Sequence, residues 1–142
     1  MKLAVVAVGR LRPPELRALA DQYLGRIRRY ARCDEWEVRE AGRLQQISLD
    51  GARHVALDVT GERLTSLEFA ARLDRWTSTG KGAVAFFLGG ADGIPEPLLA
   101  GAHHRLSLSS LTFPHRLARV LLYEQLYRAL TILRHEPYAR ED

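Results

Sequence analysis

Three hydroxyl side chains stand close together in a segment that could bind a polar ligand: Ser109, Ser110 and Thr112. They follow the short alternating run 106–108, whose pattern predicts a strand. Pro114 comes next, and proline is tolerated at the first position of a helix, where its missing N–H would have no partner anyway. Thr112 is placed to cap that helix. We therefore predict a strand, a tight loop and a helix N-terminus, which together present backbone donors and acceptors to a ligand.

Two further loops follow predicted strands. Residues 60–62 follow the predicted strand 54–59, and residues 89–95 follow the most hydrophobic strand of the sequence. Ligands of open α/β sheets bind outside the carboxyl ends of the strands, so we expect the three loops to converge there. The pair Gly89-Gly90 allows a close backbone approach but lacks the spacing of a dinucleotide fingerprint or a P-loop. On this motif alone, a tight turn that binds nothing is the alternative.

His115 is the histidine whose position favours a functional role. It falls in the first turn of the helix that follows the loop 109–113, called the hydroxyl loop below. His54, in contrast, falls in a strand, and His103 and His104 fall in a loop. A purely structural role for His115 is the alternative. The single cysteine, Cys33, excludes an internal disulfide, and no Cys/His cluster has the spacing of a zinc site. We therefore predict no metal and, from the lone cysteine, a reduced cytoplasmic setting.

The positive charge of the chain comes almost wholly from arginine. Lys and Arg number 21 against 17 Asp and Glu, and only Lys2 and Lys81 are lysines. Arginine suits bidentate contacts with phosphate, but a general bias toward arginine would give the same count. Arg28, Arg29 and Arg32 either stabilise the end of a predicted helix or contact RNA. No run of eighteen apolar residues occurs, so we predict no membrane span.

The apolar periodicity of the sequence predicts an α/β fold. The five predicted strands are 2–8, 34–40, 54–59, 83–88 and 106–108. Helical periodicity predicts helices over 16–27, 65–80, 95–101 and 116–133, and a capping box marks the start of the second of them. The alternation of the two predicts one domain, residues 1–142, with a mostly parallel sheet and helices on both faces.

The last predicted helix is apolar on two faces. One face comprises Leu122, Leu126, Ala129, Leu130 and Leu133, and the other comprises Leu117, Val120, Leu121 and Tyr127. We predict that the first face packs on the sheet and the second on another subunit, which would make the protein a homodimer. The alternative is a helix covered entirely by its own domain.

Several stretches in combination resemble the RlmH family. These are the N-terminal strand ending at Gly9 and the segments 86–93, 106–115, 124–129 and 137–138. The family consists of SPOUT-class 23S rRNA pseudouridine N3-methyltransferases. The resemblance implies an α/β fold with a C-terminal trefoil knot that holds S-adenosylmethionine, and a homodimer with its active site near the subunit interface. It also implies a pseudouridine target in helix 69 of 23S rRNA, in the assembled ribosome.

The resemblance also implies site residues. The cofactor contacts carry over to Leu57, Gly89, Leu108, Ser109, Ser110, Leu111, Thr112 and Phe113. Tyr138 and Arg140 of the tail would stabilise charge as the pseudouridine N3–H is lost, and His115 would orient the loop or the RNA. The alternative for Tyr138 is a packing anchor.

The chain departs from the family pattern in two places. The family usually ends in Pro-Tyr-His-Arg, whereas this chain has Ala139 in place of the histidine, and its segment 42–52 is shorter. The first departure leaves a non-catalytic ribosome-binding protein as an alternative to the enzyme. A small-nucleotide sensor that ignores RNA is a further one.

Overall fold

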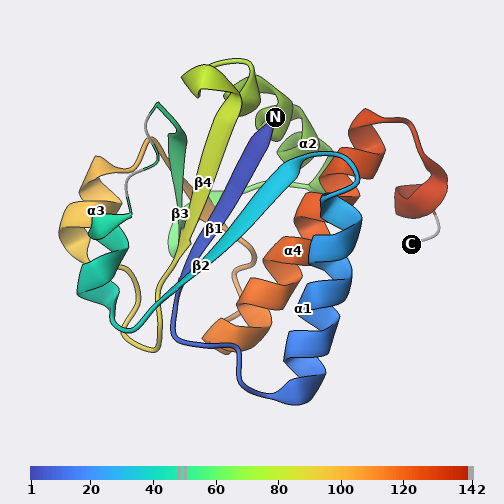
Figure 1. Cartoon of the computed structure of the whole chain (residues 1–142). Coiled ribbons are helices and arrows are strands. Elements are labelled where there is room, and N and C mark those ends of the chain that lie inside the picture. The colour runs from blue at the N-terminus through green and yellow to red at the C-terminus, as the bar shows by residue number, and fades with distance from the viewer. Residues whose placement is uncertain (48, 50, 141–142) are drawn as a thin grey trace.

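The computed structural model describes residues 1–47, 49 and 51–140, with only the backbone of Arg140. Its sheet is five-stranded, wholly parallel, and ordered β2-β1-β4-β3-β5 (Figure 1). The strands are β1 (Lys2–Val8), β2 (Arg32–Val38), β3 (Arg53–Arg63), β4 (Ala83–Leu88) and β5 (His104–Ser107). The predicted parallel α/β architecture is therefore confirmed, with β1 and β4 as the nearly continuous apolar strands expected of the sheet interior.

Helices cover both faces of the sheet. The α-helices are α1 (Pro14–Ile27), α2 (Ser66–Thr77), α3 (Glu96–Gly101) and α4 (His115–Leu133), and the 3-10 helices are η1 (Ala41–Gln46), η2 (Gly80–Gly82) and η3 (Pro137–Arg140). One core cluster joins α1, α2 and α4 to the sheet, and a second, smaller cluster joins η1 and α3 to the opposite face (Figure 1). The capping box of α2 forms as predicted, because Thr65 and Glu68 exchange hydrogen bonds.

The last helix, α4, packs between α1 and α2. Leu122, Tyr123 and Leu126 are wholly buried against the sheet. Of the face predicted to meet another subunit, Val120 belongs instead to the core, being only 3% exposed, because α1 and α2 flank α4 on both sides. Leu117 remains 38% exposed. The outward face of α4 is thus narrower than its apolar pattern predicted.

The third strand is longer than its pattern predicted. It continues to Arg63, and pairs with β5 on both sides of a register shift between Leu57 and Glu62. The predicted turn at 60–62 is corrected: residues 58–61 form a bulge within the strand, and Glu62 and Arg63 pair with β5 again. Gly61 permits this, because a Cβ there would lie 2.8 Å from the backbone of Leu106.

Two of the arginines at the end of α1 have local partners. The Nε of Arg28 donates to the carbonyl oxygen of Cys33 at 3.0 Å, and Arg32 lies 3.3 Å from the carboxylate of Asp34. The first contact ties the end of α1 to β2, the second lies within β2, and both favour a structural role for the two side chains. Of the shortened segment 42–52, residues 48 and 50 lie outside the described residues.

The path after β4 carries the chain from one face of the sheet to the other. After β4 the chain forms α3 on the face of the sheet that carries the smaller core cluster. It then enters β5, which lies on the far side of β3 from β4. From β5 it crosses the carboxyl edge through residues 108–114 and enters α4 on the opposite face (Figure 1). This crossing brings the hydroxyl loop over the ends of β3 and β4.

Candidate active site

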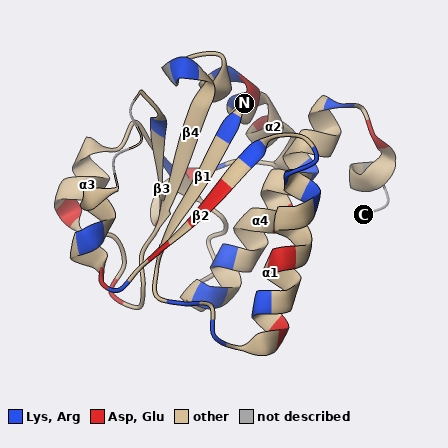
Figure 2. Cartoon of the chain, in the orientation of Figure 1, with Lys and Arg blue, Asp and Glu red and all other residues tan. Residues whose placement is uncertain are grey.

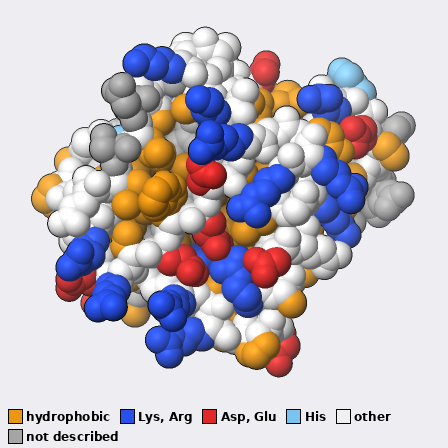
Figure 3. Space-filling view, in the orientation of Figure 1, with side chains coloured by type: hydrophobic (Ala, Val, Ile, Leu, Met, Phe, Trp, Pro, Cys, Tyr) orange, Lys and Arg blue, Asp and Glu red, His pale blue; other side chains and the backbone are white. Residues whose placement is uncertain are grey.

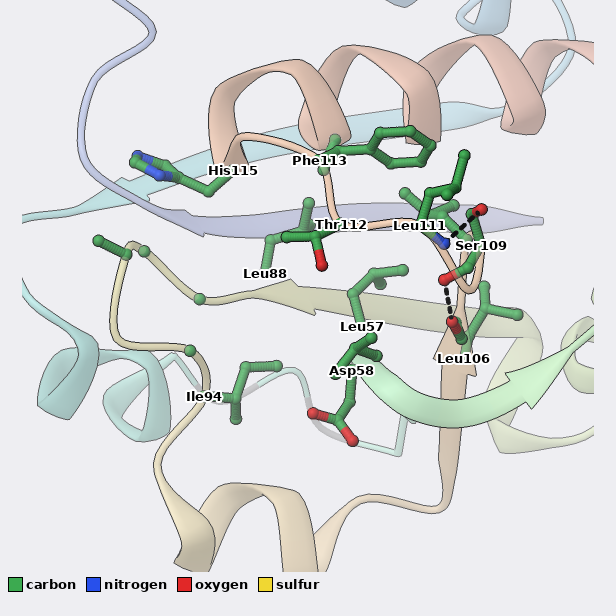
Figure 4. Close-up of a pocket in the computed structure, with 18 residues that line it drawn as sticks. Leu57, Asp58, Leu88, Ile94, Leu106, Ser109, Leu111, Thr112, Phe113 and His115 are labelled. Carbon is green, nitrogen blue, oxygen red and sulfur yellow. Dashed lines mark hydrogen bonds between the residues drawn. The ribbon is translucent and has the colours of Figure 1, made fainter.

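A cavity of about 320 Å³ lies at the carboxyl ends of β3, β4 and β5 (Figure 4). Its lining comprises residues 57–59, 88–91, 93–94, 106–109, 111–113, 115 and 118. Two of the three loops predicted to converge do so, and residues 57–59 stand in place of the third. The volume falls at the lower end of the range of about 300–1,000 Å³ that small-molecule sites occupy.

The glycine loop after β4 folds tightly onto itself. Gly90 and Gly93 form an isolated bridge, and the N–H of Gly93 donates to the carbonyl oxygen of Gly90 at 3.0 Å. A Cβ on Gly89 would lie 2.3 Å from the carbonyl carbon of Gly93, so a side chain there would force the turn open. The sequence left open whether Gly89-Gly90 forms a tight turn or part of a ligand site. In the structure the segment does both, because the tight turn lines the cavity.

The hydroxyl loop is held by its own side chains. Ser107 donates through its hydroxyl to the carbonyl oxygen of Ser109 at 2.9 Å, and the N–H of Leu111 donates to the Ser109 hydroxyl oxygen at 2.9 Å. The Thr112 hydroxyl points into the cavity (Figure 4). Ser110 is exposed and is not among the lining residues, so the structure does not bring it to the cavity with its neighbours.

The start of α4 differs from the prediction in one detail. The helix begins at His115 with Pro114 as its N-cap, and no side chain caps it. Thr112 is therefore not a helix cap. Pro114 is still extended, with φ −54° and ψ 139°, so the helix begins one residue later and the Thr112 hydroxyl faces the cavity instead.

Asp58 contributes a carboxylate that the sequence reasoning missed. It lines the cavity directly after Leu57, and its Oδ2 accepts hydrogen bonds from the N–H and the hydroxyl of Thr60. The available signal was an acidic residue in the second half of an apolar strand near the carboxyl edge of a parallel sheet. A carboxylate at this edge can accept hydrogen bonds from ribose hydroxyls.

The sites expected for cofactor contact and for catalysis lie at opposite ends of α4. His115 lies at the cavity rim, at the first residue of the helix. Tyr138 lies beyond the last residue, and the 19 residues of α4 between them span about 28 Å at 1.5 Å per residue. Within one chain the structure therefore does not bring Tyr138 to the cavity. The side chain of Arg140 lies outside the described residues.

Tyr138 is anchored where it lies. Its hydroxyl donates to Oε2 of Glu124 at 2.8 Å, and its ring packs edge-on against Tyr127 at 4.6 Å between centroids. The guanidinium of Arg128 sits 5.1 Å from the same ring centroid. Burial, together with the hydrogen bond to the Glu124 carboxylate, raises the pKa of Tyr138 above its ordinary range. The phenol is thus a hydrogen-bond donor at neutral pH and fits the packing-anchor alternative.

The fold is shared by solved methyltransferases. A probable methylase family protein from Haemophilus influenzae Rd KW20 superposes with a TM-score of 0.62 at 11% identity, covering 96% of this chain and 69% of that one. The SpoU methyltransferase AviRb from Streptomyces viridochromogenes, solved with the cofactor AdoMet, gives a TM-score of 0.55 at 10% identity, covering 95% and 59%. At such low identity these likenesses establish the fold class alone.

Sequence relatives narrow the class. The family described as predicted SPOUT methyltransferase matches residues 1–139, and the chain belongs to this family. It is 55% identical over 144 residues to the ribosomal RNA large subunit methyltransferase H of Sorangium cellulosum (strain So ce56), covering 98% of this chain and 99% of that relative. The protein of the same name from Anaeromyxobacter dehalogenans (strain 2CP-C) is 45% identical over 152 residues, covering 97% and 99%. The resemblance to the RlmH family is therefore confirmed.

The lining fits an S-adenosylmethionine cofactor, in agreement with the family. Aliphatic side chains such as Leu88 and Ile94 offer an apolar surface to a flat base, Asp58 offers an acceptor to a ribose, and the loop backbone offers polar groups to a base edge. Among the described residues, no cluster of His, Cys, Asp and Glu could hold a metal ion, and no helix is long and apolar enough to cross a membrane.

Proposed function

We propose that this protein transfers a methyl group from S-adenosylmethionine to N3 of a pseudouridine in helix 69 of 23S rRNA, on the assembled ribosome in the cytoplasm. The observation that carries the proposal is the cavity built from the Gly89–Gly93 turn and the hydroxyl loop, in a chain related over its full length to rRNA methyltransferases. Its near-neutral, backbone-rich lining suits a reaction that needs alignment more than strong acid or base groups.

The cofactor residues in this proposal are Leu57, Gly89, Leu108, Ser109, Leu111, Thr112 and Phe113, with Asp58 added from the structure. Ser110 is left out because it does not line the cavity. Once bound, the cofactor supplies a sulfonium methyl group, which is already an activated electrophile. The chain must therefore hold that methyl group in line with the attacking nitrogen and keep water away from both.

The chemistry at the target nitrogen fixes what the remaining residues must do. Transfer would join N3 of pseudouridine to the methyl carbon, leave the electron pair of the carbon–sulfur bond on sulfur, and release the N3 proton to solvent water. As the proton leaves, negative charge spreads onto the two flanking carbonyl oxygens. A phenol or guanidinium donor beside them stabilises that charge, and Tyr138 and Arg140 are the groups we assign to it.

Because Tyr138 and the cavity lie at opposite ends of α4, the proposal requires a homodimer. The partner subunit's Tyr138 and the partner subunit's Arg140 would then face the cavity of the first chain. Exposed leucines support an apolar contact surface at both ends of α4: Leu111 is 72% and Leu117 38% exposed at the cavity end, and Leu67 is 70% exposed in the hollow near the tail.

We also propose that the chain is knotted at this edge, as a C-terminal trefoil. The support is the path already described, in which residues 108–114 cross the carboxyl edge over the ends of β3 and β4 and line one cavity with both. A knot would fix the hydroxyl loop against both neighbours and so preform the cofactor cavity. Knots are rare in proteins, so this feature rests on the family and on the path together.

A second candidate function is a ribosome-binding protein that keeps the cofactor cavity without transferring a methyl group. Ala139, at the place of the usual family histidine, is the observation that favours it. One experiment separates the two functions. Ribosomes from cells lacking the protein are incubated with the purified protein and S-adenosylmethionine, and the helix 69 fragment is analysed by mass spectrometry. Methylation at N3 supports the enzyme, whereas an unmodified pseudouridine with retained ribosome binding supports the second function.

A further inference from the structure

A second cleft, of about 860 Å³, opens beside the cofactor cavity. The loop after β1, the end of β2 and the first turn of α4 form its walls, with the lining residues Gly9, Arg10, Arg12, Glu37, Val38, Arg39, His115 and Arg116. His115 belongs to both linings, so the two hollows share a wall. Lys and Arg gather at this lower edge of the molecule (Figure 2), and the space-filling view shows basic side chains along it (Figure 3).

Four arginines give this cleft its charge. Arg10, Arg12, Arg39 and Arg116 are all exposed, and none forms an ion pair with a carboxylate in the described part of the chain. Some arginines elsewhere are paired: Arg128, for example, lies 2.8 Å from the carboxylate of Glu124. The cleft arginines are thus free to contact an anionic partner.

The one acidic residue that lines the cleft, Glu37, is paired with a buried arginine. Glu37 pairs with Arg119, a guanidinium only 3% exposed, and accepts a hydrogen bond from the N–H of Leu11 at 3.0 Å. The other end of the Arg119 guanidinium donates to the carbonyl oxygen of Gly9 at 3.0 Å. The carboxylate therefore does not cancel the four exposed charges.

The same contacts fix the loop that carries two of the arginines. Arg10 lies between Gly9 and Leu11, which are held by the Arg119 guanidinium and the Glu37 carboxylate respectively. The Leu11 side chain is buried, at 3% exposure, and so pins the loop to the core. A loop held at backbone groups on both sides of Arg10 loses little conformational freedom when its arginines bind a ligand.

We infer that Arg10, Arg12, Arg39 and Arg116 bind the phosphate backbone of the RNA substrate next to the nucleotide that is methylated. This inference rests on the proposed function and adds the surface that holds the substrate. The planar guanidinium fork matches the oxygens of a phosphate, and several such groups lining one polar cleft suit successive phosphates of a strand. Because His115 separates the cleft from the cofactor cavity, a strand lying in the cleft places a neighbouring base beside the cavity.

The test is binding to protein-free 23S rRNA and to intact ribosomes, without cofactor, at several salt concentrations. Each of the variants Arg10→Gln, Arg12→Gln, Arg39→Gln and Arg116→Gln should weaken binding about five- to eightfold near 0.1 M salt, which is the factor expected from losing one phosphate contact. The slope of log K against log salt should fall by about 0.7 to 0.9 for each arginine removed. The affinity for S-adenosylmethionine, measured by calorimetry, should not change.

Arg75→Gln is the matched control. Arg75 is exposed near the end of α2, at the amino edge of the sheet. Its substitution removes the same charge as the cleft variants, but far from the cleft. Equal affinities and equal salt slopes for the cleft variants and for Arg75→Gln would overturn the inference. Weaker binding to ribosomes with unchanged binding to protein-free rRNA would also overturn it, in favour of an acidic protein surface as the partner. Since binding is measured without methyl transfer, a failure of the proposed reaction leaves this result readable.

Discussion

The two ends of α4 differ in what surrounds them. At its first turn, the helix meets a cavity lined mainly by aliphatic side chains and backbone, with the Gly89–Gly93 turn as its floor. At its last turn it meets a cluster of tyrosines and charged groups, in which Tyr138 and Arg128 bind the same carboxylate of Glu124. The first end can hold a small ligand by itself, whereas the hollow at the second end lacks the glycine turn and the hydroxyl loop and is lined by Arg128, Glu136 and Ala139 among others. This difference is the reason for proposing that the cavity of one chain and the tail of a partner chain form one site.

The largest effect is expected at the cavity end, from Gly89→Ala. The new Cβ would lie 2.3 Å from the carbonyl carbon of Gly93, which no rotamer change can relieve. We expect a loss of S-adenosylmethionine affinity of about 100-fold or more, since the loop backbone must move out of its cofactor-binding position. Calorimetry would measure it. Gly25→Ala, in α1 with open space around its Cβ, is the control and should bind normally; equal affinities in the two variants would remove the turn from the cofactor site.

The next largest effect is expected in methyl transfer, which should need both the cavity at one end of α4 and the tail at the other. Arg140→Ala should abolish methylation of ribosomes while leaving cofactor binding intact, because it removes a donor from the developing negative charge. If the tail acts across the dimer, unfolding and refolding Arg140→Ala together with Gly89→Ala should restore activity. Mixed dimers then carry one site with both an intact cavity and an intact tail. Half the dimers are mixed and each has one good site of two, so recovery should reach about a quarter of the native rate. No recovery would place tail and cavity in the same chain.

A smaller effect concerns the buried charges beneath the cavity end. Burial by itself would raise the pKa of Glu35, but hydrogen bonds from Arg17 and Tyr123 and the charge of Arg119 hold that pKa below its ordinary value. A lowered folded-state pKa contributes stability above the unfolded-state value of about 4.5, and this contribution is lost as pH falls through the folded-state pKa. Urea unfolding between pH 6 and pH 3 should show the decline. Glu35→Gln should flatten it, and an unchanged pH profile in that variant would contradict the prediction.

The smallest effect is expected at the tail end. Tyr138→Phe keeps the ring contact with Tyr127 but loses the hydrogen bond to Glu124, so the free energy of unfolding should fall by about 1 kcal/mol. Tyr127→Phe is the comparison, because its hydroxyl has no hydrogen-bond partner among the described residues. Urea unfolding measures both. Equal stabilities for the two variants would mean that the Tyr138 hydroxyl does not anchor the tail, and unchanged methylation by Tyr138→Phe would remove that hydroxyl from the reaction.

Local patterns predicted most of the elements but misplaced some boundaries. The apolar runs gave β1 and β4 correctly, and the capping box gave the start of α2. The turn expected at 60–62 proved to lie in a bulge of β3, after which Glu62 pairs with Leu106, 44 residues away in sequence. Thr112 was expected to cap α4 and instead faces the cavity. Both errors concern residues whose partners are distant in the chain.

Part of the site was also predictable from local sequence, and part of it was not. The loops after β4 and β5 were found from glycine and hydroxyl residues at the ends of apolar strands, and the family motifs added Leu57. Asp58 was missed because one acidic residue late in an apolar strand is too weak a signal to single out from the sequence. The cluster of Arg119, Glu35 and Glu37 was also beyond reach, since it joins residues about 80 positions apart whose charges look like ordinary surface charges in the sequence.

The sequence by itself determined the α/β class, the parallel sheet and the family, because apolar periodicity and short motifs are properties of consecutive residues. Only the tertiary structure decided the strand order β2-β1-β4-β3-β5, the cavity at its edge and the arginine cleft beside it. It also decided that Tyr138 lies a full helix length from that cavity. These features depend on which distant segments pair, and pairing is chosen by the burial of whole elements against one another rather than by any local run of residues.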